Sequence, residues 1–359
     1  MTERAAPEAD ARRFREEFAD AVTPRAAVLV VGVLLLQFAF TLSYVGAFHS
    51  PKPHHISLAV VAPEQVSTQL VGGLNGIRFG PVKARPLPDE ATAAAKIRLG
   101  KLSPALVVDG AGTTDRLLVA TAGGASVATA VQQVVQAAET QHQRTVVVDD
   151  IVPVQPGDAR GLTGFYLVLS WIVGGYLMAA LLGMTKGARP ANVRRATIRL
   201  MSVVPYAIAS GLGGAVIVDQ VLGALTGHFV ALWWLGALVV VASAAATMAF
   251  QVLFGVLGIG MTVLFFVVLG NPSAGGAYQP AMLPPFWRTL SNALPNGAAT
   301  DAVRRVMYFG AHGNAWHLAV LVIYAIAGAA VTLGGSWLLE RRSRASLGST
   351  AAELLGSGA

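Results

Sequence analysis

Two short clusters in the chain carry side chains that can bind a metal ion or transfer a proton. His54 and His55 are adjacent, and Asp149 and Asp150 end the run "VVVDD". Neighbouring residues on a strand point to opposite faces of a sheet, so the two aspartates are not expected to act as a carboxylate pair. An adjacent histidine pair at the entrance of a strand is usually polar surface. Neither cluster predicts a catalytic site or a metal site.

Motifs for nucleotide hydrolysis, metalloproteolysis and serine hydrolysis are missing. The patterns G-x-x-x-x-G-K-[ST], H-E-x-x-H and G-x-S-x-G do not occur in the 359 residues. The chain has no cysteine, which excludes disulfides, thiol catalysis and cysteine-ligated metals. The stretch "GLGGAV" at Gly211 lies inside an apolar run, where small residues favour close helix packing. We expect a protein that is not an enzyme, needs no cofactor and has no ATPase site of its own.

The composition indicates an integral membrane protein. Hydrophobic residues make up 54% of the chain and charged residues 13%, which is about half the usual quarter for a soluble domain. The net charge of +7 is explained by lysines and arginines on the cytoplasmic flanks of membrane spans, so nucleic acid is not an expected partner.

Long apolar runs predict the membrane spans, at about 20 residues per crossing. Single spans are expected at 26–48, 164–184, 200–225 and 316–339, and the run 229–270 is long enough for two that turn near Gln251–Gly255. With both termini in the cytoplasm, the basic flanks all fall on one side: Arg25, the Lys186–Arg199 loop, and Arg341, Arg342 and Arg344. The sequence therefore predicts an α-helical polytopic membrane protein with six spans.

Residues 49–161 have the pattern of a small α/β domain. Strand-like runs such as "ISLAVVAP" and "RTVVVDDIVPV" alternate with helical runs such as "EQVSTQLVGGL" and "SVATAVQQVVQAAETQ". Since this stretch follows the first span, we expect an extracytoplasmic domain between spans one and two. The remaining segments are then a cytoplasmic helix over 1–25, a five-helix membrane domain over 162–340 and a cytoplasmic tail over 341–359.

The N-terminal segment before the first span is amphipathic. Phe14, Phe18 and Val22 recur at helical spacing, with arginines and glutamates opposite them. Such a helix lies along the membrane surface, either as a simple anchor or as a docking element.

Ionisable side chains are nearly absent from the predicted spans. Asp219 lies late in the third span, near the outer interface, and Gln37, Gln220 and Gln251 either line a path or bond a neighbouring helix. Carriers driven by an ion gradient need buried ionisable groups. If this protein moves a substrate, we expect the energy to come from a partner.

A segment rich in proline and glycine, 271–309, interrupts the apolar runs before the last span. It is "NPSAGGAYQPAMLPPFWRTLSNALPNGAATDAVRRVMYF", and the predicted topology places it outside the cytoplasm. Its large apolar residues favour short broken helices that dip into the outer leaflet and pack against the bundle. Asp301 is spaced to pair with Arg304 or Arg305 on a helix.

This order of elements, together with the 271–309 segment and the strand "ISLAVVAPE" after the first span, resembles the ABC type-2 exporter permeases. The nearest branch is that of the YhgE/Pip-like (phage-infection-protein-like) membrane proteins. The resemblance implies a bacterial plasma membrane protein that exports an amphipathic or lipid-like substrate. Its implied partners are a cytoplasmic ATP-binding-cassette ATPase, membrane lipid and a second permease, either another copy in a homodimer or a related chain. The alternative is an ATPase-independent scaffold or secretion accessory that binds a partner through the extracytoplasmic domain.

The resemblance also implies three functional segments, although it transfers no substrate-binding residue. The connecting helix would contain Phe14, Phe18 and Val22. The ATPase-coupling loop would contain Lys186, Arg189, Arg194, Arg195 and Arg199. The outer re-entrant gate would contain Asn271, Pro272, Gly275, Gly276, Leu283, Pro284, Pro295, Asp301 and Arg304.

Overall fold

The computed structural model describes residues 12–13, 16–17 and 23–356. It divides into two compact units, Met1–Gly46 and Ala47–Ala359. Phe14, Phe18 and Val22 of the expected connecting helix lie outside the described residues. Helix α2 (Pro24–Phe48) covers the expected first span, 26–48. Its last two residues belong to the second unit. Its most apolar stretch is 6% buried.

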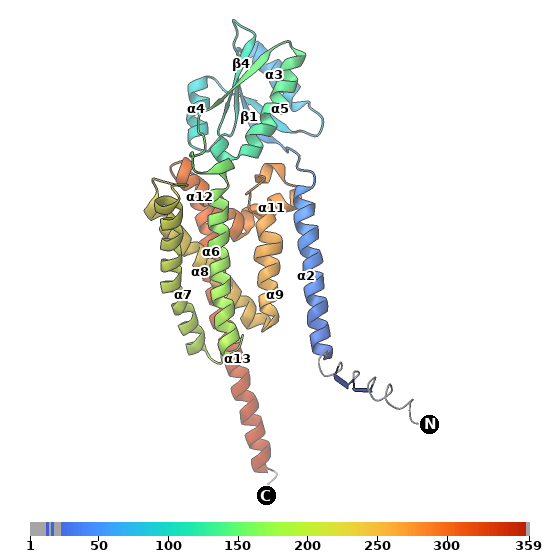
Figure 1. Cartoon of the computed structure of the whole chain (residues 1–359), viewed down its shortest axis with the longest axis vertical. Helices are drawn as coiled ribbons and strands as arrows, with labels where there is room; N and C mark the ends of the chain where they lie inside the picture. Colours follow the sequence, from blue (N-terminus) through green and yellow to red (C-terminus); the bar gives the residue numbers. More distant parts are fainter. Residues whose placement is uncertain (1–11, 14–15, 18–22, 357–359) are drawn as a thin grey trace, which may run out of the picture. The chain divides into compact units, whose positions relative to one another are not determined.

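The α/β domain in the second unit has the strands and helices that the sequence predicts. In chain order these are β1 (Ile56–Val61), α3 (Glu64–Asn75), β2 (Val82–Pro86), α4 (Glu90–Arg98), β3 (Ala105–Val107), β4 (Thr114–Val119), α5 (Ala125–Gln141) and β5 (Thr145–Asp150). The strand order is β2-β1-β3-β4-β5, with β3 and β4 antiparallel and the other neighbours parallel. Figure 1 shows α3 and α5 on one face of the sheet and α4 on the other.

Alternation along the strands decides which helix covers which face. Leu58 and Leu117 are buried in the cluster beneath α3 and α5. Their sequence neighbours Ala59 and Leu118 are buried with Ile97 of α4. Successive strand residues point to opposite faces, so a sheet with a core on both faces needs apolar side chains at consecutive strand positions. The sheet is therefore packed on both sides.

Among the residues that the structure describes, five helices are long and apolar enough to cross a membrane. Besides α2 these are α6 (Thr163–Lys186), α7 (Val193–Ala215) continued by the π-helical η3 (Val216–Val221), α8 (Phe229–Phe254) and α13 (Ala315–Gly356). In α8, 61% of the most apolar stretch is buried, the largest share of the five. Helix α8 is therefore the central helix, and α6, α7 and α13 pack against it. Helix α13 continues without a break into the segment expected as a separate tail after residue 340.

The predicted turn within 229–270 is at Gly255, which ends α8 with a φ of 64° that favours glycine. The chain then forms α9 (Leu257–Val263) and the π-helical η4 (Leu264–Gly270). The apolar helix over Leu257–Ser273 is shorter than the five others. At 1.5 Å per residue it is about 25 Å long, against a hydrocarbon core of about 30 Å. A sixth complete span stays a prediction.

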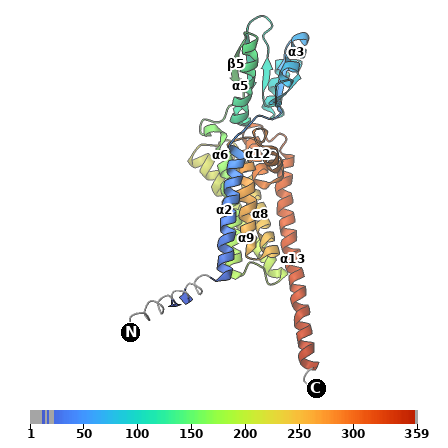
Figure 2. The same cartoon turned by 90° about the vertical axis from the view of Figure 1, so that its right-hand side faces the viewer.

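The segment 271–309 folds as short helices separated by turns, as its prolines and glycines predict. Its elements are α10 (Asn271–Ser273), η5 (Pro280–Met282), α11 (Pro285–Ala293) and α12 (Pro295–Tyr308). Figures 1 and 2 both show α12 between the α/β domain and the long helices of the second unit. We call this segment the crown.

Candidate functional site

The loop between α6 and α7 is tied to the ends of two long helices by two of the five residues expected to couple to an ATPase. Arg189 donates hydrogen bonds to the carbonyls of Val252 (3.0 Å) and Leu253 (2.9 Å) at the end of α8. Arg199 donates to the carbonyls of Lys186 (3.3 Å), Gly187 (2.9 Å) and Ala188 (3.3 Å) at the end of α6 and just beyond it. The last carbonyls of a helix have no partner within it and carry partial negative charge, which suits arginine.

Lys186, Arg194 and Arg195 are exposed, as is the rest of Arg189, whereas Arg199 is half-buried. The loop has a defined conformation because Asn192 caps α7, accepting from the Arg195 backbone N–H at 2.9 Å. The Val193 backbone N–H donates to Glu340 of α13 at 3.2 Å. The loop therefore presents exposed cations on a backbone that is fixed to α6, α8 and α13.

The crown is held together by two partly buried polar contacts between its parts. The Asn296 amide donates to the Asn271 side chain at 2.9 Å and to the Phe266 carbonyl at 3.1 Å. Arg304 forms the expected ion pair with Asp301 and donates to the Gly275 carbonyl at 2.9 Å. Of the two arginines at suitable spacing, Arg304 is therefore the partner of Asp301.

The remaining residues of the expected gate determine the backbone conformation of the crown. Gly275 has a φ of 74°, and a β-carbon at Gly276 would lie 2.6 Å from the Phe165 ring. Pro284 precedes α11 and Pro295 begins α12, where a proline is tolerated because the first helical N–H needs no partner. Pro272 is buried, and Leu283 is buried against Trp287. These residues fix the backbone of the crown and pack it closely.

The crown also joins the α/β domain to the long helices, a role that the sequence analysis missed. Ser126 at the start of α5 donates to the Gln279 side chain. The Tyr308 hydroxyl donates to Asp158 at 2.5 Å, and the Asp158 carboxylate accepts from the Thr163 N–H, the first residue of α6, at 2.8 Å. Burial, followed by the bond to Asp158, raises the pKa of the Tyr308 hydroxyl. The Ser126–Gln279 and Tyr308–Asp158 contacts link residues about 150 positions apart, so local sequence patterns do not reveal them.

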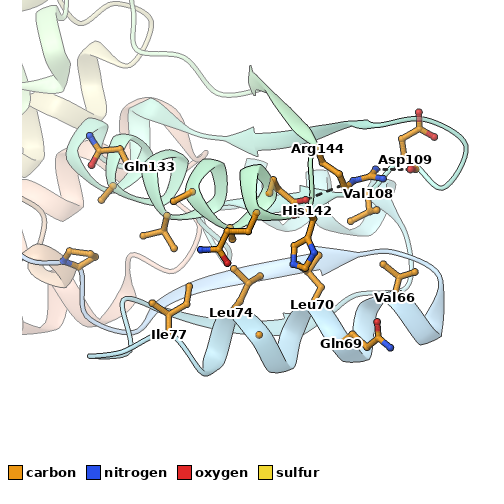
Figure 3. A pocket seen from close by; sticks show the side chains of 18 of the residues that line it. Val66, Gln69, Leu70, Leu74, Ile77, Val108, Asp109, Gln133, His142 and Arg144 are labelled. Carbon is orange, nitrogen blue, oxygen red and sulfur yellow. Dashed lines mark hydrogen bonds and ion pairs between the residues drawn. The ribbon is translucent and has the colours of Figure 1, made fainter.

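A groove between α3 and α5 forms a cavity with a volume of about 790 Å³. Val134 of α5 lines it, and so do Leu70 and Leu74 of α3, which are labelled in Figure 3. Asp109, Glu139, His142 and Arg144 make one end of it polar. Binding sites for small molecules are typically apolar clefts of about 300–1,000 Å³ with a few polar groups. The groove has the size and the lining of such a site.

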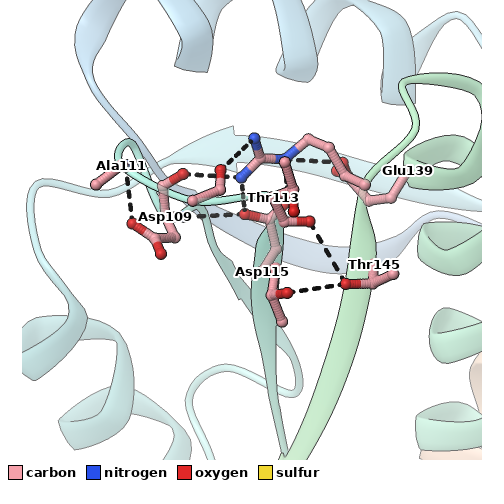
Figure 4. A network of polar contacts seen from close by, with 9 residues as sticks. Asp109, Ala111, Thr113, Asp115, Glu139 and Thr145 are labelled. Carbon is pink, nitrogen blue, oxygen red and sulfur yellow. Dashed lines mark hydrogen bonds and ion pairs between the residues drawn. The ribbon is translucent and has the colours of Figure 1, made fainter.

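The polar end of the groove is organised by Arg144. Its guanidinium contacts both oxygens of the fully buried Asp115 carboxylate, at 2.5 and 2.7 Å, and donates to the carbonyls of Asp109 (2.8 Å) and Gly112 (3.0 Å). Figure 4 shows how this network ties the turn around Asp109–Thr113 to the start of β5.

Two carboxyls in this network have opposite pKa shifts. Burial raises the pKa of Asp115, but the bonds from Arg144 and from the Asp109 N–H outweigh it, so the pKa lies below its ordinary value. Burial, then the charge of Asp115, raises the pKa of Glu139, whose Oε1 is buried without a hydrogen-bond partner. Two carboxyls so close to each other are not both ionised at low cost. Glu139 therefore holds its proton more strongly than Asp115 does, although Arg144 also lies 3.8 Å from a Glu139 oxygen.

The two clusters considered first in the sequence have separate roles in the structure. Asp149 pairs with Arg116 at 2.8 Å, and Asp150 accepts from Thr121 on the other side of β5. The predicted independence of the two aspartates is confirmed. The backbone N–H of His54 donates to the Ala281 carbonyl of the crown at 2.9 Å, and burial, with the nearby charge of Arg288, lowers the pKa of its ring. Within the described ranges, no three histidine, aspartate or glutamate side chains gather closely enough to hold a metal ion.

Polar residues of the predicted spans serve the helices themselves. The buried Gln251 donates to the Ala179 carbonyl of α6 at 3.2 Å. Of the two expected roles, lining a path or bonding a neighbouring helix, Gln251 therefore has the second. Asp219 lies in the π-helical η3 and accepts from its neighbour Gln220 at 3.1 Å.

In comparisons with known proteins, no family model, curated protein or solved structure matches the chain.

Proposed function

We propose that this chain is the permease subunit of an ATP-binding-cassette exporter in a bacterial plasma membrane. The observation that supports this best is the α6–α7 loop, which exposes Lys186, Arg194 and Arg195 while Arg189 and Arg199 hold the ends of α8 and α6. A loop of this kind transmits force, because its outer side chains are free to bind a partner and its inner ones contact the helices directly.

In this proposal a separate cytoplasmic ATPase binds the exposed cations and moves the loop when it binds ATP. The displacement passes to α6 and α8, which both contact α12 of the crown at their other ends. Movement of α12 then opens an exit for an amphipathic or lipid-like substrate. A pair of permeases, either two copies of this chain or this chain and a related one, would enclose the path.

The test is a charge reversal at the exposed positions. We expect the double variant Arg194→Glu/Arg195→Glu to lose a co-purifying ATPase, identified by mass spectrometry, and its stimulated ATP hydrolysis. The matched control is Arg341→Glu/Arg342→Glu, which removes the same charge from exposed positions on α13. Undiminished ATPase binding and stimulation in the Arg194/Arg195 variant would count against the exporter.

The groove between α3 and α5 supports a second candidate, a membrane scaffold or secretion accessory that binds a partner through the α/β domain. Under this alternative, Leu70→Glu in the groove abolishes function, whereas Thr68→Glu on the exposed side of α3 leaves it unchanged. Deleting residues 49–161 also removes all function if the chain is a scaffold, so activity retained without them refutes it.

A further inference from the structure

A second cavity, of about 350 Å³, lies where the α/β domain meets the crown. The turn after α4, the start of α5, η5 and α12 contribute to its lining. Basic side chains are concentrated there: His55, Lys101, Arg304 and Arg305. We call this cavity the junction pocket.

The junction pocket has more positive than negative charge. Asp301 is the only carboxylate among the lining residues, and its ion pair with Arg304 neutralises both. Neither Lys101 nor Arg305 forms an ion pair with a carboxylate of residues 23–24 and 26–345, where side chains are described. Two cations therefore face a small cavity without a counter-charge.

The Arg305 guanidinium has unused hydrogen-bonding capacity. One of its terminal nitrogens donates to the His312 carbonyl at 2.9 Å, but its Nε is buried and has no acceptor. A buried donor without an acceptor costs about 1–3 kcal/mol, so a ligand that supplies an acceptor is favoured there. Phosphate oxygens match the fork of an arginine side chain particularly well.

The start of α5 adds to the positive potential. Gly123 and Val127 line the pocket, and the first turn of this 17-residue helix has neither an acidic residue nor a side-chain cap. The amino-terminal end of a helix carries a partial positive charge that favours anions.

From these observations we propose that the junction pocket binds the phosphate group of a headgroup-sized ligand through Lys101 and Arg305. Its volume is near the lower limit for ligand sites, which suits a phosphorylated headgroup better than a large molecule. A free phosphate ester and a phospholipid headgroup share this chemistry. Binding at the pocket stands on its own contacts, and only its use in export rests on the proposed function.

The experiment is calorimetric titration of the full-length chain in a neutral detergent, without nucleotide or ATPase. The probes are glycerol 3-phosphate, dioctanoyl phosphatidic acid and, as a neutral amphiphile, dioctanoylglycerol. We expect both phosphate probes to bind and Arg305→Gln and Lys101→Gln each to weaken binding by about tenfold or more, as the loss of a charge-assisted hydrogen bond predicts. Equal affinity for the two phosphates assigns the site to a free ester, and at least tenfold tighter binding of phosphatidic acid assigns it to a lipid.

Matched controls are Arg85→Gln and Lys83→Gln, exposed on β2 and absent from the pocket lining. Arg305 also donates a hydrogen bond to the His312 carbonyl, so Arg305→Gln is expected to lower the stability of the fold as well. Lys101→Gln provides the same test without losing that bond. The proposal is overturned if no phosphate probe binds, if the pocket variants bind as tightly as the controls, or if dioctanoylglycerol binds as well as phosphatidic acid. Because no ATPase is present, failure of the exporter mechanism leaves these results unchanged.

Discussion

Replacing Arg144 with glutamine tests whether its network holds the polar end of the α3–α5 groove. The change removes both contacts to the Asp115 carboxylate, whose side chain is fully buried. Breaking a buried ion pair by removing one partner costs about 3–5 kcal/mol, because the other charge stays buried and unpaired. The Arg144 side chain is 23% exposed, so water screens part of the interaction and we expect the lower limit, about 3 kcal/mol.

The assay is hydrogen exchange by mass spectrometry on the full-length chain in detergent. A loss of about 3 kcal/mol corresponds to roughly a hundredfold loss of protection in peptides from β4 and β5, at 1.36 kcal/mol per factor of ten. The matched control is Arg116→Gln, one residue from Asp115 on the opposite face of β4, where the pairs to Glu90 and Asp149 are exposed. Exposed pairs contribute about 0–1 kcal/mol each, so the loss of both lowers its protection by at most about thirtyfold.

Two results would refute this reasoning. One is a loss in Arg144→Gln no larger than that in Arg116→Gln. The other is a failure of Asp115→Asn to restore part of the protection in the Arg144→Gln background, since a neutral asparagine no longer requires a cation. Either would mean that the Arg144–Asp115 contact is a minor part of the domain's stability.

Three further predictions concern single side chains. The pKa of Glu139 is raised, so the folded state keeps this proton at pH values above the ordinary pKa of 4.5. The free energy of unfolding therefore falls as the pH rises through the raised pKa. Glu139→Gln should abolish this fall, as measured by hydrogen exchange between pH 5 and 8. A β-carbon at Gly211 would lie 2.4 Å from a backbone oxygen of α8, so Gly211→Ala should lower the free energy of unfolding by about 1–3 kcal/mol. Gly213 has open space around it, so Gly213→Ala should be neutral or slightly stabilising. Thermal unfolding in detergent, followed by tryptophan fluorescence, separates the two. Tyr308→Phe removes a donor from the buried Asp158 carboxylate and should reduce amide protection at the start of α6 by about 1.5–3 kcal/mol, whereas unchanged protection would show that water replaces the hydroxyl.

The sequence alone predicted the elements of this protein because hydropathy and periodicity are local properties. Five apolar runs became helices long enough to span a membrane, and alternating runs in 49–161 became the strands and helices of the α/β domain. Gly255 ends α8 inside the expected turn, and the prolines of 271–309 start new helices. Helix length was less predictable, since α13 continues past residue 340 and the apolar helix over Leu257–Ser273 is short for a span.

Only the tertiary structure decided which charged and polar residues act together. Arg144 and Asp115 are 29 residues apart, and Arg189 lies 63 residues from the carbonyl of Val252 that it contacts. In the sequence, Arg189 and Arg199 were indistinguishable from the exposed Arg194 and Arg195, because composition does not show which side chain reaches a helix end. Lys101 and Arg305 likewise meet only because the α/β domain packs on the crown. Hydropathy is a property of each segment by itself. A polar contact, by contrast, needs a specific partner, and only folding brings that partner within hydrogen-bond distance.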